Sequence, residues 1–506
     1  MSASHTLANI VRVTINIGSG PSLGAASVSE ASPAEVPGTG EHGADTRRDF
    51  SLSSVFGVAF AFISPIIALY TIFNLGLGIA GASFWWAFLV VLIGQLLVAL
   101  VFGELSSRWP EEGGVYAWAR RLVGRRFGWC TGWVYAITLI TLNAAGAFAA
   151  SSFAATLFDV PEAGTALLLG FAIGFIALAT SANVLSRRTL KVFITASLVC
   201  EVIGSLFVGT VLLMFHRHND FSVLMSGFRD GGMDFATGPF LAAVAVVGWA
   251  LIGFESAGDL AAEVKRPERN VPLAQIGSLV LVALTVMYAG LALILAIPDL
   301  DTVATGQIDD AIIDTLTTNL GPGVVVPICL VVCIGFTAGI TAVSATLSRI
   351  VHAMATSGSL PASRLLVRLS AREGVPRFAL ALTSLATAAL LLLSVLIGFH
   401  NVMISMSTGG FYIAFFLPVA AMLILRIKGM WASGEFNLGP ITGFAVNAAA
   451  ALWLLAEIIN ISWPRSTGQP WFVEWGCLLM YTITGAVGAL LFRRYAPSTR
   501  KDTLHA

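Results

Sequence analysis

Twelve long apolar segments dominate this sequence, and each of them is long enough to cross a lipid bilayer as a helix. A transmembrane helix needs about 20 predominantly apolar residues. Inside a bilayer the backbone polar groups find no water, so only helices and closed barrels can span it. The chain is therefore predicted to be an all-α polytopic membrane protein with twelve transmembrane helices. The segments are approximately Val55–Gly76, Trp85–Leu105, Phe127–Phe158, Ala166–Asn183, Lys191–Phe215, Phe240–Ala261, Ala274–Ile297, Val324–Ser344, Phe378–Ile397, Val402–Leu425, Ile441–Ile461 and Phe472–Phe492.

Composition excludes several classes of function. Hydrophobic residues make up 57% of the 506 residues and charged ones only 11%, which is too apolar for a soluble domain. The net charge is zero, so no basic surface for nucleic acid is indicated. The five cysteines lie in apolar runs and are interpreted as reduced packing residues. No cluster of the seven histidines with cysteine has metal-ligand spacing, so we expect neither a metal nor a cofactor.

The distribution of basic residues predicts the orientation. Cytoplasmic loops of membrane proteins carry an excess of lysine and arginine. With the N-terminus inside, 25 of the 28 lysines and arginines lie on the inner side, and only Arg217, Arg229 and Arg465 lie outside. Both termini are therefore expected in the cytoplasm, with the protein in the plasma (inner) membrane. Residues 1–50, rich in Ser, Ala, Gly, Pro and Glu, are predicted to be a disordered tail.

The sixth segment contains a carboxylate that is costly in lipid. Residues 240–272 begin as a uniformly apolar helix, pass through Gly253-Phe254-Glu255 and end in charge. A charged side chain at the bilayer centre costs roughly 2.5 to 3.5 kcal/mol on insertion scales, so Glu255 is expected to face protein, water or a cation. The small residues around it hold a continuous helix poorly. We therefore expect a helix break here, lining the kind of cavity in which transporters bind substrate.

The first segment carries a second interruption, at Phe62-Ile63-Ser64-Pro65-Ile66. Proline removes one helix hydrogen bond and clashes with the carbonyl group four residues earlier, while Ser64 can satisfy a freed backbone group. A plain proline kink is the alternative. Two interrupted segments five apart, each at the start of one half, predict an inverted repeat with the binding site at the repeat interface.

Three motifs resemble those of amino acid permeases in the amino acid–polyamine–organocation superfamily. They are FGELSSRWPEEGGVYAW at residues 102–118, GFESAGDLAAEVKRPERNVP at residues 253–272 and SRIVHAMATSGSLP at residues 348–361. With the motifs in the expected order and places, the resemblance extends over about Phe56 to Arg426. The branch that the chain most resembles is the amino acid/choline transporter group, which includes GABA permeases.

This resemblance implies the LeuT-type fold, with a 5+5 inverted repeat and two peripheral C-terminal helices. The transport core would be residues 51–430, divided into repeats 51–235 and 236–430, followed by peripheral helices in 431–495 and a cytoplasmic tail in 496–506. It also implies that the unwound first and sixth helices hold the substrate, with the third, eighth and tenth closing the pocket.

The first break departs from the family pattern in one respect. Many members carry Gly-Ser-Gly there, where backbone N–H groups meet the carboxylate of an α-amino acid. This chain reads Ser64-Pro65-Ile66, and proline donates no N–H. The departure puts a standard carboxylate clamp in doubt and leaves room for GABA, choline, ethanolamine or a polyamine.

The predicted substrate site follows from the electrostatics of broken helices. Their N-terminal ends attract anions and their C-terminal ends attract cations. Trp249 is expected to contact an ammonium group through its ring face, and Phe254 to act as an aromatic lid; core packing is the alternative for both. Glu255 either faces the ammonium or bonds to freed amides of the break. The full set is Ser64, Pro65, Ile66, Asn143, Trp249, Ile252, Gly253, Phe254 and Glu255.

Glu201 is the candidate group for ion coupling. It is a lone acid in the middle of the fifth segment with no basic residue nearby in sequence. Desolvation favours its protonated form, which suits a carrier of a coupled proton; a role in facing the substrate amine or in interhelical hydrogen bonding is the alternative. Thr341 and Ser344 in the eighth segment could hold a coupled cation, or serve as small packing residues.

The sequence therefore predicts a secondary active transporter, a permease that imports an amino acid or a related, GABA-like amine by alternating access. A proton or a sodium ion would be coupled to transport, and the protein would act as a monomer or homodimer. A choline, ethanolamine or polyamine transporter, or an amino acid exchanger of the same fold, is the alternative. A membrane enzyme or sensor is disfavoured because no catalytic motif and no sizeable soluble domain is present.

Overall fold

The computed structural model describes residues 50–160, 163–185, 187–230, 232–304, 308, 310–370, 374–399, 402–465 and 468–495. Within these residues the regular structure is helical, apart from one isolated bridge between Phe50 and Val264. The expected tails, residues 1–50 and 496–506, lie outside the described residues except for Phe50.

The helices follow the apolar segments closely. Those of the first half are α2 (Leu52–Ile63), α3 (Pro65–Ala80), η1 (Gly81–Phe84), α4 (Trp85–Arg108), α5 (Gly114–Val123), α6 (Arg125–Leu157), α7 (Thr165–Leu185), α8 (Arg187–Phe215), η2 (Phe221–Met225), α9 (Ser226–Asp230) and α10 (Gly232–Thr237). Those of the second half are α11 (Pro239–Val247), η3 (Gly248–Leu251), α12 (Ser256–Asp259), η4 (Ala261–Glu263), α13 (Pro267–Ala296), α14 (Leu300–Ala304), α15 (Ala311–Leu320), α16 (Pro322–Thr356), α17 (Ser363–Leu366), α18 (Arg377–Leu396), α19 (Val402–Ile427), α20 (Pro440–Ser462), α21 (Trp471–Glu474) and α22 (Gly476–Tyr495).

Ten candidate membrane spans occur among the described residues. The first of them covers residues 52–108 and takes in the first two predicted segments. The fifth predicted segment falls in α8, within which Gly204–Phe215 forms a shorter apolar helix. The protein is thus a multi-pass membrane protein, and the count of twelve crossings stays a prediction.

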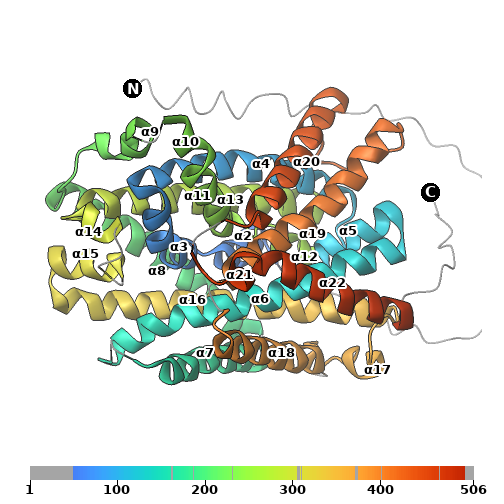
Figure 1. Cartoon of the computed structure of the whole chain (residues 1–506). Helices are drawn as coiled ribbons and strands as arrows, with labels where there is room; N and C mark the ends of the chain where they lie inside the picture. The colour runs from blue at the N-terminus through green and yellow to red at the C-terminus, as the bar shows by residue number, and fades with distance from the viewer. Residues whose placement is uncertain are drawn as a thin grey trace, which may run out of the picture.

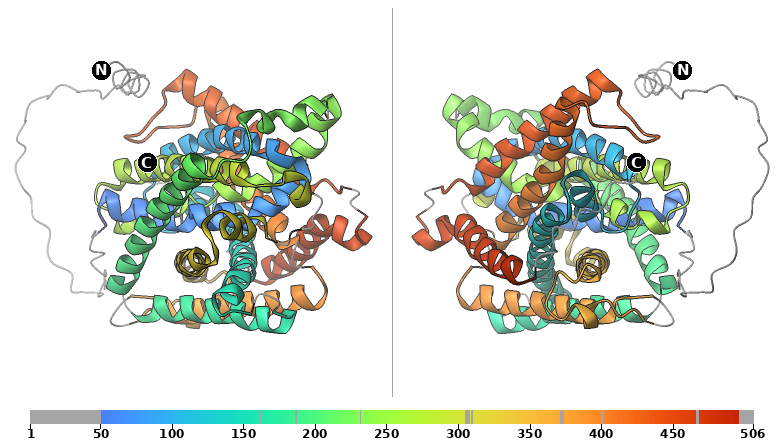
Figure 2. Two further views of the ribbon diagram at one scale, coloured as in Figure 1. Left: turned by 90° about the vertical axis from the view of Figure 1, so that its left-hand side faces the viewer. Right: turned by 90° about the vertical axis from the view of Figure 1, so that its right-hand side faces the viewer.

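The two halves of the chain are interleaved. α6 packs along α16, α4 along α13, and α3 against α11. α7 and α18 lie side by side below α6 and α16 in Figure 1. Figure 2 views α16 end-on inside the molecule, with α7 and α18 running beneath it. The first and sixth predicted segments therefore meet near the centre, against the long helices α6 and α16.

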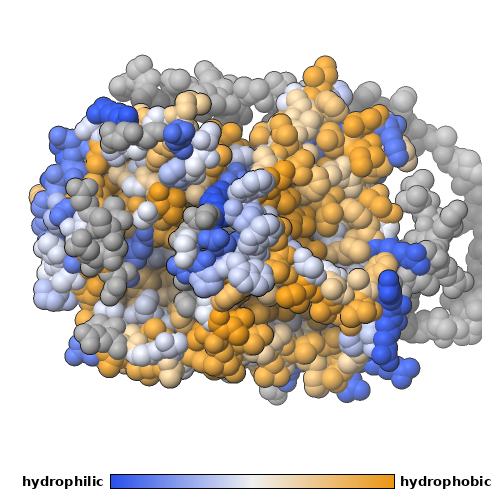
Figure 3. All heavy atoms as spheres, in the orientation of Figure 1, coloured by the Kyte–Doolittle hydropathy of each residue, from blue (hydrophilic) through white to orange (hydrophobic). Residues whose placement is uncertain are grey.

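The surface is consistent with insertion in a bilayer. In Figure 3 hydrophobic residues cover most of the visible face, while hydrophilic ones gather chiefly at the left and right ends, with a smaller polar patch near α21. Large apolar side chains are correspondingly exposed along α7, α18, α20 and α22. Such an apolar surface is stable against lipid tails and unstable in water.

Arg349 of α16 connects the three motifs of the sequence. Its guanidinium lies 3.2 Å from Glu263, in the second motif, and 3.9 Å from Glu112, in the first. In the first motif the buried Glu104 also pairs with Arg426 at the end of α19. Motifs far apart in sequence thus hold one end of the bundle together through ion pairs, of which those of Glu263 and Glu104 are largely shielded from water.

Helix α15 is fastened to α3 at the opposite end of the bundle. The Asp310 carboxylate caps α15 by accepting from the N–H groups of Ile312 and Ile313, at 3.0 and 3.1 Å. The Asn74 side chain of α3 accepts from the N–H of Ala311 at 3.0 Å. Burial raises the pKa of the Asp310 carboxyl, because the charged form loses water.

We expect Asp310→Ala to lower the free energy of unfolding by about 1 kcal/mol, because two N-terminal amides of α15 lose their acceptor. Asp310→Asn, which keeps an acceptor oxygen, is the matched control and is expected to cost less. Melting curves of the purified proteins in detergent measure both. Equal losses in the two variants would show that the cap contributes nothing.

The same pair of proteins reports on the charge of Asp310. A pKa raised in the folded state means that the folded protein binds this proton more tightly than the unfolded chain does. The stability of the wild type relative to Asp310→Asn is therefore expected to be greatest at acid pH and to fall as the pH rises through the raised pKa. Melting temperatures measured from about pH 4 to pH 8 test this; a relative stability that grows with pH contradicts it.

Candidate functional site

The first predicted segment is broken at Ser64. Helix α2 ends as the Ser64 N–H donates to the Phe60 carbonyl at 2.7 Å, and Ser64 itself has the unusual backbone angles φ 47° and ψ 111°. Helix α3 then begins at Pro65, a residue suited to the first position of a helix. The Ser64 hydroxyl caps α3 by accepting from the Ile67 N–H at 3.2 Å. The interruption is thus a complete break with a new helix start, not a plain kink.

The sixth predicted segment is broken at Ile252 and Gly253. Helix α11 tightens into η3, Ile252 is extended, and Gly253 has φ +107°, where a side chain would be strained. A Cβ atom at Gly253 would also clash with the ring of Phe62, so the two breaks touch. The Glu255 carboxylate accepts from the Gly253 N–H at 3.0 Å and satisfies a freed amide.

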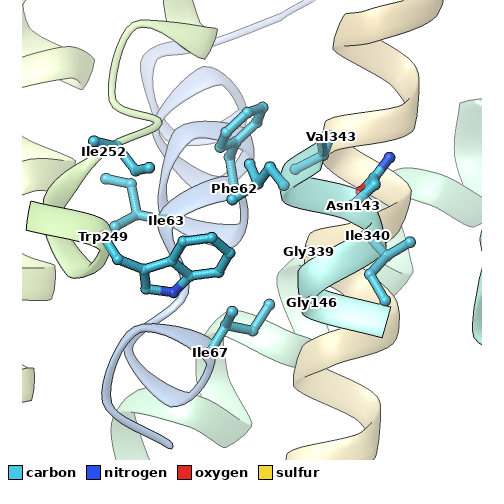
Figure 4. Close-up of a pocket in the computed structure, with 11 residues that line it drawn as sticks. Phe62, Ile63, Ile67, Asn143, Gly146, Trp249, Ile252, Gly339, Ile340 and Val343 are labelled. Carbon is cyan, nitrogen blue, oxygen red and sulfur yellow. The ribbon is translucent and has the colours of Figure 1, made fainter. Parts of the chain in front are cut away.

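A pocket lies between the two breaks, and its empty space together with the open solvent that it meets is about 390 Å³. Figure 4 shows Trp249 and Ile252 on one side, the end of α2 in the middle, and α6 with α16 on the other side. Three of the predicted site residues line it: Asn143, Trp249 and Ile252. The full lining is Phe62, Ile63, Ile67, Leu142, Asn143, Gly146, Trp249, Ile252, Gly339, Ile340 and Val343.

Glu201 reaches the first break from α8. Its side chain is fully buried and accepts from the Ser64 hydroxyl at 2.5 Å and from the Ser197 hydroxyl one turn earlier on α8. The backbone N–H of Ile66 also faces this carboxylate. Gly335 allows the close approach of α16, since a Cβ there would lie 3.3 Å from the Glu201 carboxyl carbon. A carboxylate is favoured at this place because it meets the positive end of α3.

Glu255 belongs to a second buried group. Tyr135 of α6 donates from its hydroxyl to Glu255 at 2.7 Å and lies 3.4 Å from the carboxylate of Asp259. All three side chains are fully buried. Both Glu255 oxygens are thus hydrogen-bonded within the protein, which favours the structural alternative for this residue over direct contact with an ammonium group.

A family model described as amino acid permease matches residues 50–488 of the chain. The chain belongs to the amino acid permease family. This family lies in the amino acid–polyamine–organocation superfamily, as the three motifs indicated, and its members are permeases, not enzymes.

Individual relatives resemble this permease over most of their length. An amino-acid permease BAT1 homolog of Oryza sativa subsp. japonica is 25% identical, over 83% of this chain and 86% of its own. A choline transporter of Saccharomyces cerevisiae is 25% identical and a GABA-specific permease of the same yeast 23%, each over 83% of this chain and 76% of its own.

The remaining predicted residues of the permease surround the pocket without lining it. Phe254 is buried against Phe102 and Phe415, with ring centroids 6.1 and 5.7 Å away, so it packs in the core in this structure. The hydroxyl of Ser344 accepts from the Asn143 amide at 3.0 Å, and that of Thr341 donates to a backbone carbonyl of its own helix. Pro65 and Ile66 form the first turn of α3.

Sequence reasoning missed most of the apolar wall. Gly339, Ile340 and Val343 lie on α16 and Leu142 and Gly146 on α6, in helices where apolar residues occur on every side. No periodicity separates a pocket face from a lipid face in such helices. Tyr135 was missed too, because a lone tyrosine in an apolar span does not reveal the two carboxylates that it contacts.

We expect Tyr135→Phe to destabilise the permease by about 1–3 kcal/mol, because a buried Glu255 oxygen loses its donor. Tyr116→Phe is the matched control: Tyr116 is buried on α5, and its hydroxyl makes no hydrogen bond among the described residues. Thermal melting in detergent compares the two. Equal melting temperatures for the two variants would show that Tyr135 does not support the sixth-segment break.

Proposed function

We propose that this permease is a secondary active transporter that imports an amino acid or related amine across the plasma membrane, coupled to protons, by alternating access. The observation that carries the proposal is the pocket between two broken helices, with the Glu201 carboxylate bonded to one of them. Relatives named as amino acid, GABA, choline and polyamine permeases support this class of substrate.

The pocket walls support alternating access. They come from both halves of the chain: α2, α3 and α6 from the first, and η3, Ile252 and α16 from the second. A rocking motion of one half against the other therefore opens the pocket to one side while closing it to the other. The breaks at Ser64 and Gly253 supply the hinges, because the helix hydrogen bonds are already interrupted there.

The packing of the helices supports a 5+5 inverted repeat. Helices that would be equivalent in the two repeats lie against each other: α4 with α13, α6 with α16, and α7 with α18. Such pairing is expected around a pseudo-two-fold axis. The proposed topology is twelve crossings, with α20 and α22 peripheral to the core. Both termini are proposed to lie in the cytoplasm, on the side where the distribution of lysine and arginine predicts them.

Glu201 is proposed to carry the coupled proton. In its charged form the carboxylate accepts from Ser64 and Ser197 and meets the positive end of α3, so it connects α8 to the first break. Protonation removes the charge and one acceptor position, so these interactions between α8 and the first break weaken. Proton binding at Glu201 would thereby permit movement of the first broken helix. A coupled sodium ion is the alternative.

The test is uptake of labelled amino acids and amines by the purified permease in proteoliposomes, with and without an inward proton gradient. We expect accumulation driven by the gradient and unaffected by replacing sodium with potassium. Glu201→Gln is expected to abolish the gradient dependence, because the group no longer titrates. Glu457→Gln, a buried acid of α20 outside the pocket, is the matched control and keeps it.

Three results would count against this proposal. Accumulation that needs sodium would replace the proton as the coupling ion. Unchanged gradient dependence in Glu201→Gln would remove Glu201 from that role. A pure protein that accumulates none of the compounds would contradict the transport function.

A further inference from the structure

Among the residues that the structure describes, those lining the substrate pocket include no charged side chain. Its polar lining side chains are Asn143 and the indole of Trp249, as Figure 4 shows. The Asn143 amide nitrogen donates to Ser344 at 3.0 Å. Its carbonyl oxygen, Oδ1, is buried and has no hydrogen-bond partner among the described residues. The pocket thus holds a free acceptor and lacks a cationic group for a carboxylate.

The amides that a substrate carboxylate would use are already occupied. Freed N–H groups at the start of a helix are natural anion sites. At the start of α3, Pro65 has no N–H, and Glu201 takes the Ser64 hydroxyl at 2.5 Å and faces the Ile66 amide. At the sixth break, Glu255 takes the Gly253 amide at 3.0 Å. Both breaks are therefore capped by carboxylates of the protein itself.

The acidic side chains near the two breaks also favour a cation over an anion. Glu201, Glu255 and Asp259 are all fully buried near the two breaks. The positive charge of Arg349 acts on Asp259, but Arg349 is itself paired with Glu263 and Glu112. A substrate carboxylate would be buried without a partner beside these acids, while an ammonium group would be attracted.

We propose that the substrate is a small organic monoamine that carries no carboxylate, an inference that rests on the proposed transport function and narrows its substrate class. The ammonium donates to Asn143 Oδ1 and lies against the ring face of Trp249. The apolar body packs against Ile67, Ile252 and Val343. A second ammonium group would meet only apolar wall, so monoamines are favoured over diamines.

Matched pairs that differ only in the carboxylate test this inference. The pairs are phenethylamine with phenylalanine, isoamylamine with leucine, ethanolamine with serine, and propylamine with GABA. Binding is measured as the rise in melting temperature of the purified full-length permease with ligand concentration, which does not depend on ion coupling. In at least one pair we expect the amine to bind at least about tenfold more tightly than its carboxylated partner. Putrescine is expected to bind more weakly than butylamine.

A variant tests the physical reason. In Glu201→Ala the Ser64 hydroxyl and the Ile66 amide become free, so carboxylated partners are expected to gain affinity and the ratio within each pair to narrow by at least about tenfold. Glu457→Ala, outside the pocket, is the matched control and keeps the wild-type ratio. The melting temperature without ligand shows whether both variants are folded. The comparison of amines with their carboxylated partners in the wild type does not depend on these variants.

The outcomes separate this inference from the proposed function. If the carboxylated partners bind as well as the amines or better, and are taken up by proteoliposomes, the protein is a transporter and this inference is wrong. If putrescine binds more tightly than butylamine, the restriction to monoamines is wrong. If no compound of either kind is bound or taken up, the transport function fails and this inference fails with it.

Discussion

In a bilayer, backbone N–H and C=O groups that are not bonded within a helix find no water to bond to. The structure of this permease depends on how such groups are satisfied at its two helix breaks. Each break frees N–H and C=O groups in the protein interior, where an unsatisfied group costs several kcal/mol. Here acidic side chains accept from freed N–H groups: Glu201 faces the Ile66 N–H at the first break, and Glu255 accepts from the Gly253 N–H at the sixth. The two carboxylates that would be the costliest side chains in an unbroken bundle are therefore the ones that make its interruptions stable.

This arrangement links structure to the proposed mechanism. The hydrogen bond between Glu201 and Ser64 joins α8 to the start of α3, and the one between Tyr135 and Glu255 joins α6 to the sixth break. The two broken helices, which must move in the proposed mechanism, are thus held by a few hydrogen bonds. Such bonds contribute little net energy when satisfied and cost much more when one partner is lost. A proton or a cationic substrate that changes one of these partners can thus shift the balance between two arrangements of the helices.

The ion pairs of Arg349 at one end and the cap of α15 at the other hold the ends of the same bundle. The ion pairs of Arg349 join segments far apart in the chain, and so does the bond between Asn74 and the Ala311 N–H, whereas the Asp310 cap is local to α15. The pocket between the breaks is lined by residues of α6 and α16 on one side and by the interrupted helices on the other (Figure 4).

The sequence by itself determined the membrane class, both breaks and the family, because length, hydropathy and the Ser64-Pro65 and Gly253 interruptions are local properties of the chain. It also singled out Glu201, Asn143, Trp249 and Ile252. Only the tertiary structure decided what each of them meets: that Glu201 bonds to Ser64, that the Asn143 oxygen has no hydrogen-bond partner within the described part of the chain, and that Phe254 packs in the core. These contacts depend on which faces of the apolar helices pack against one another. A helix that is apolar on every side has no sequence periodicity that would predict which face packs inward.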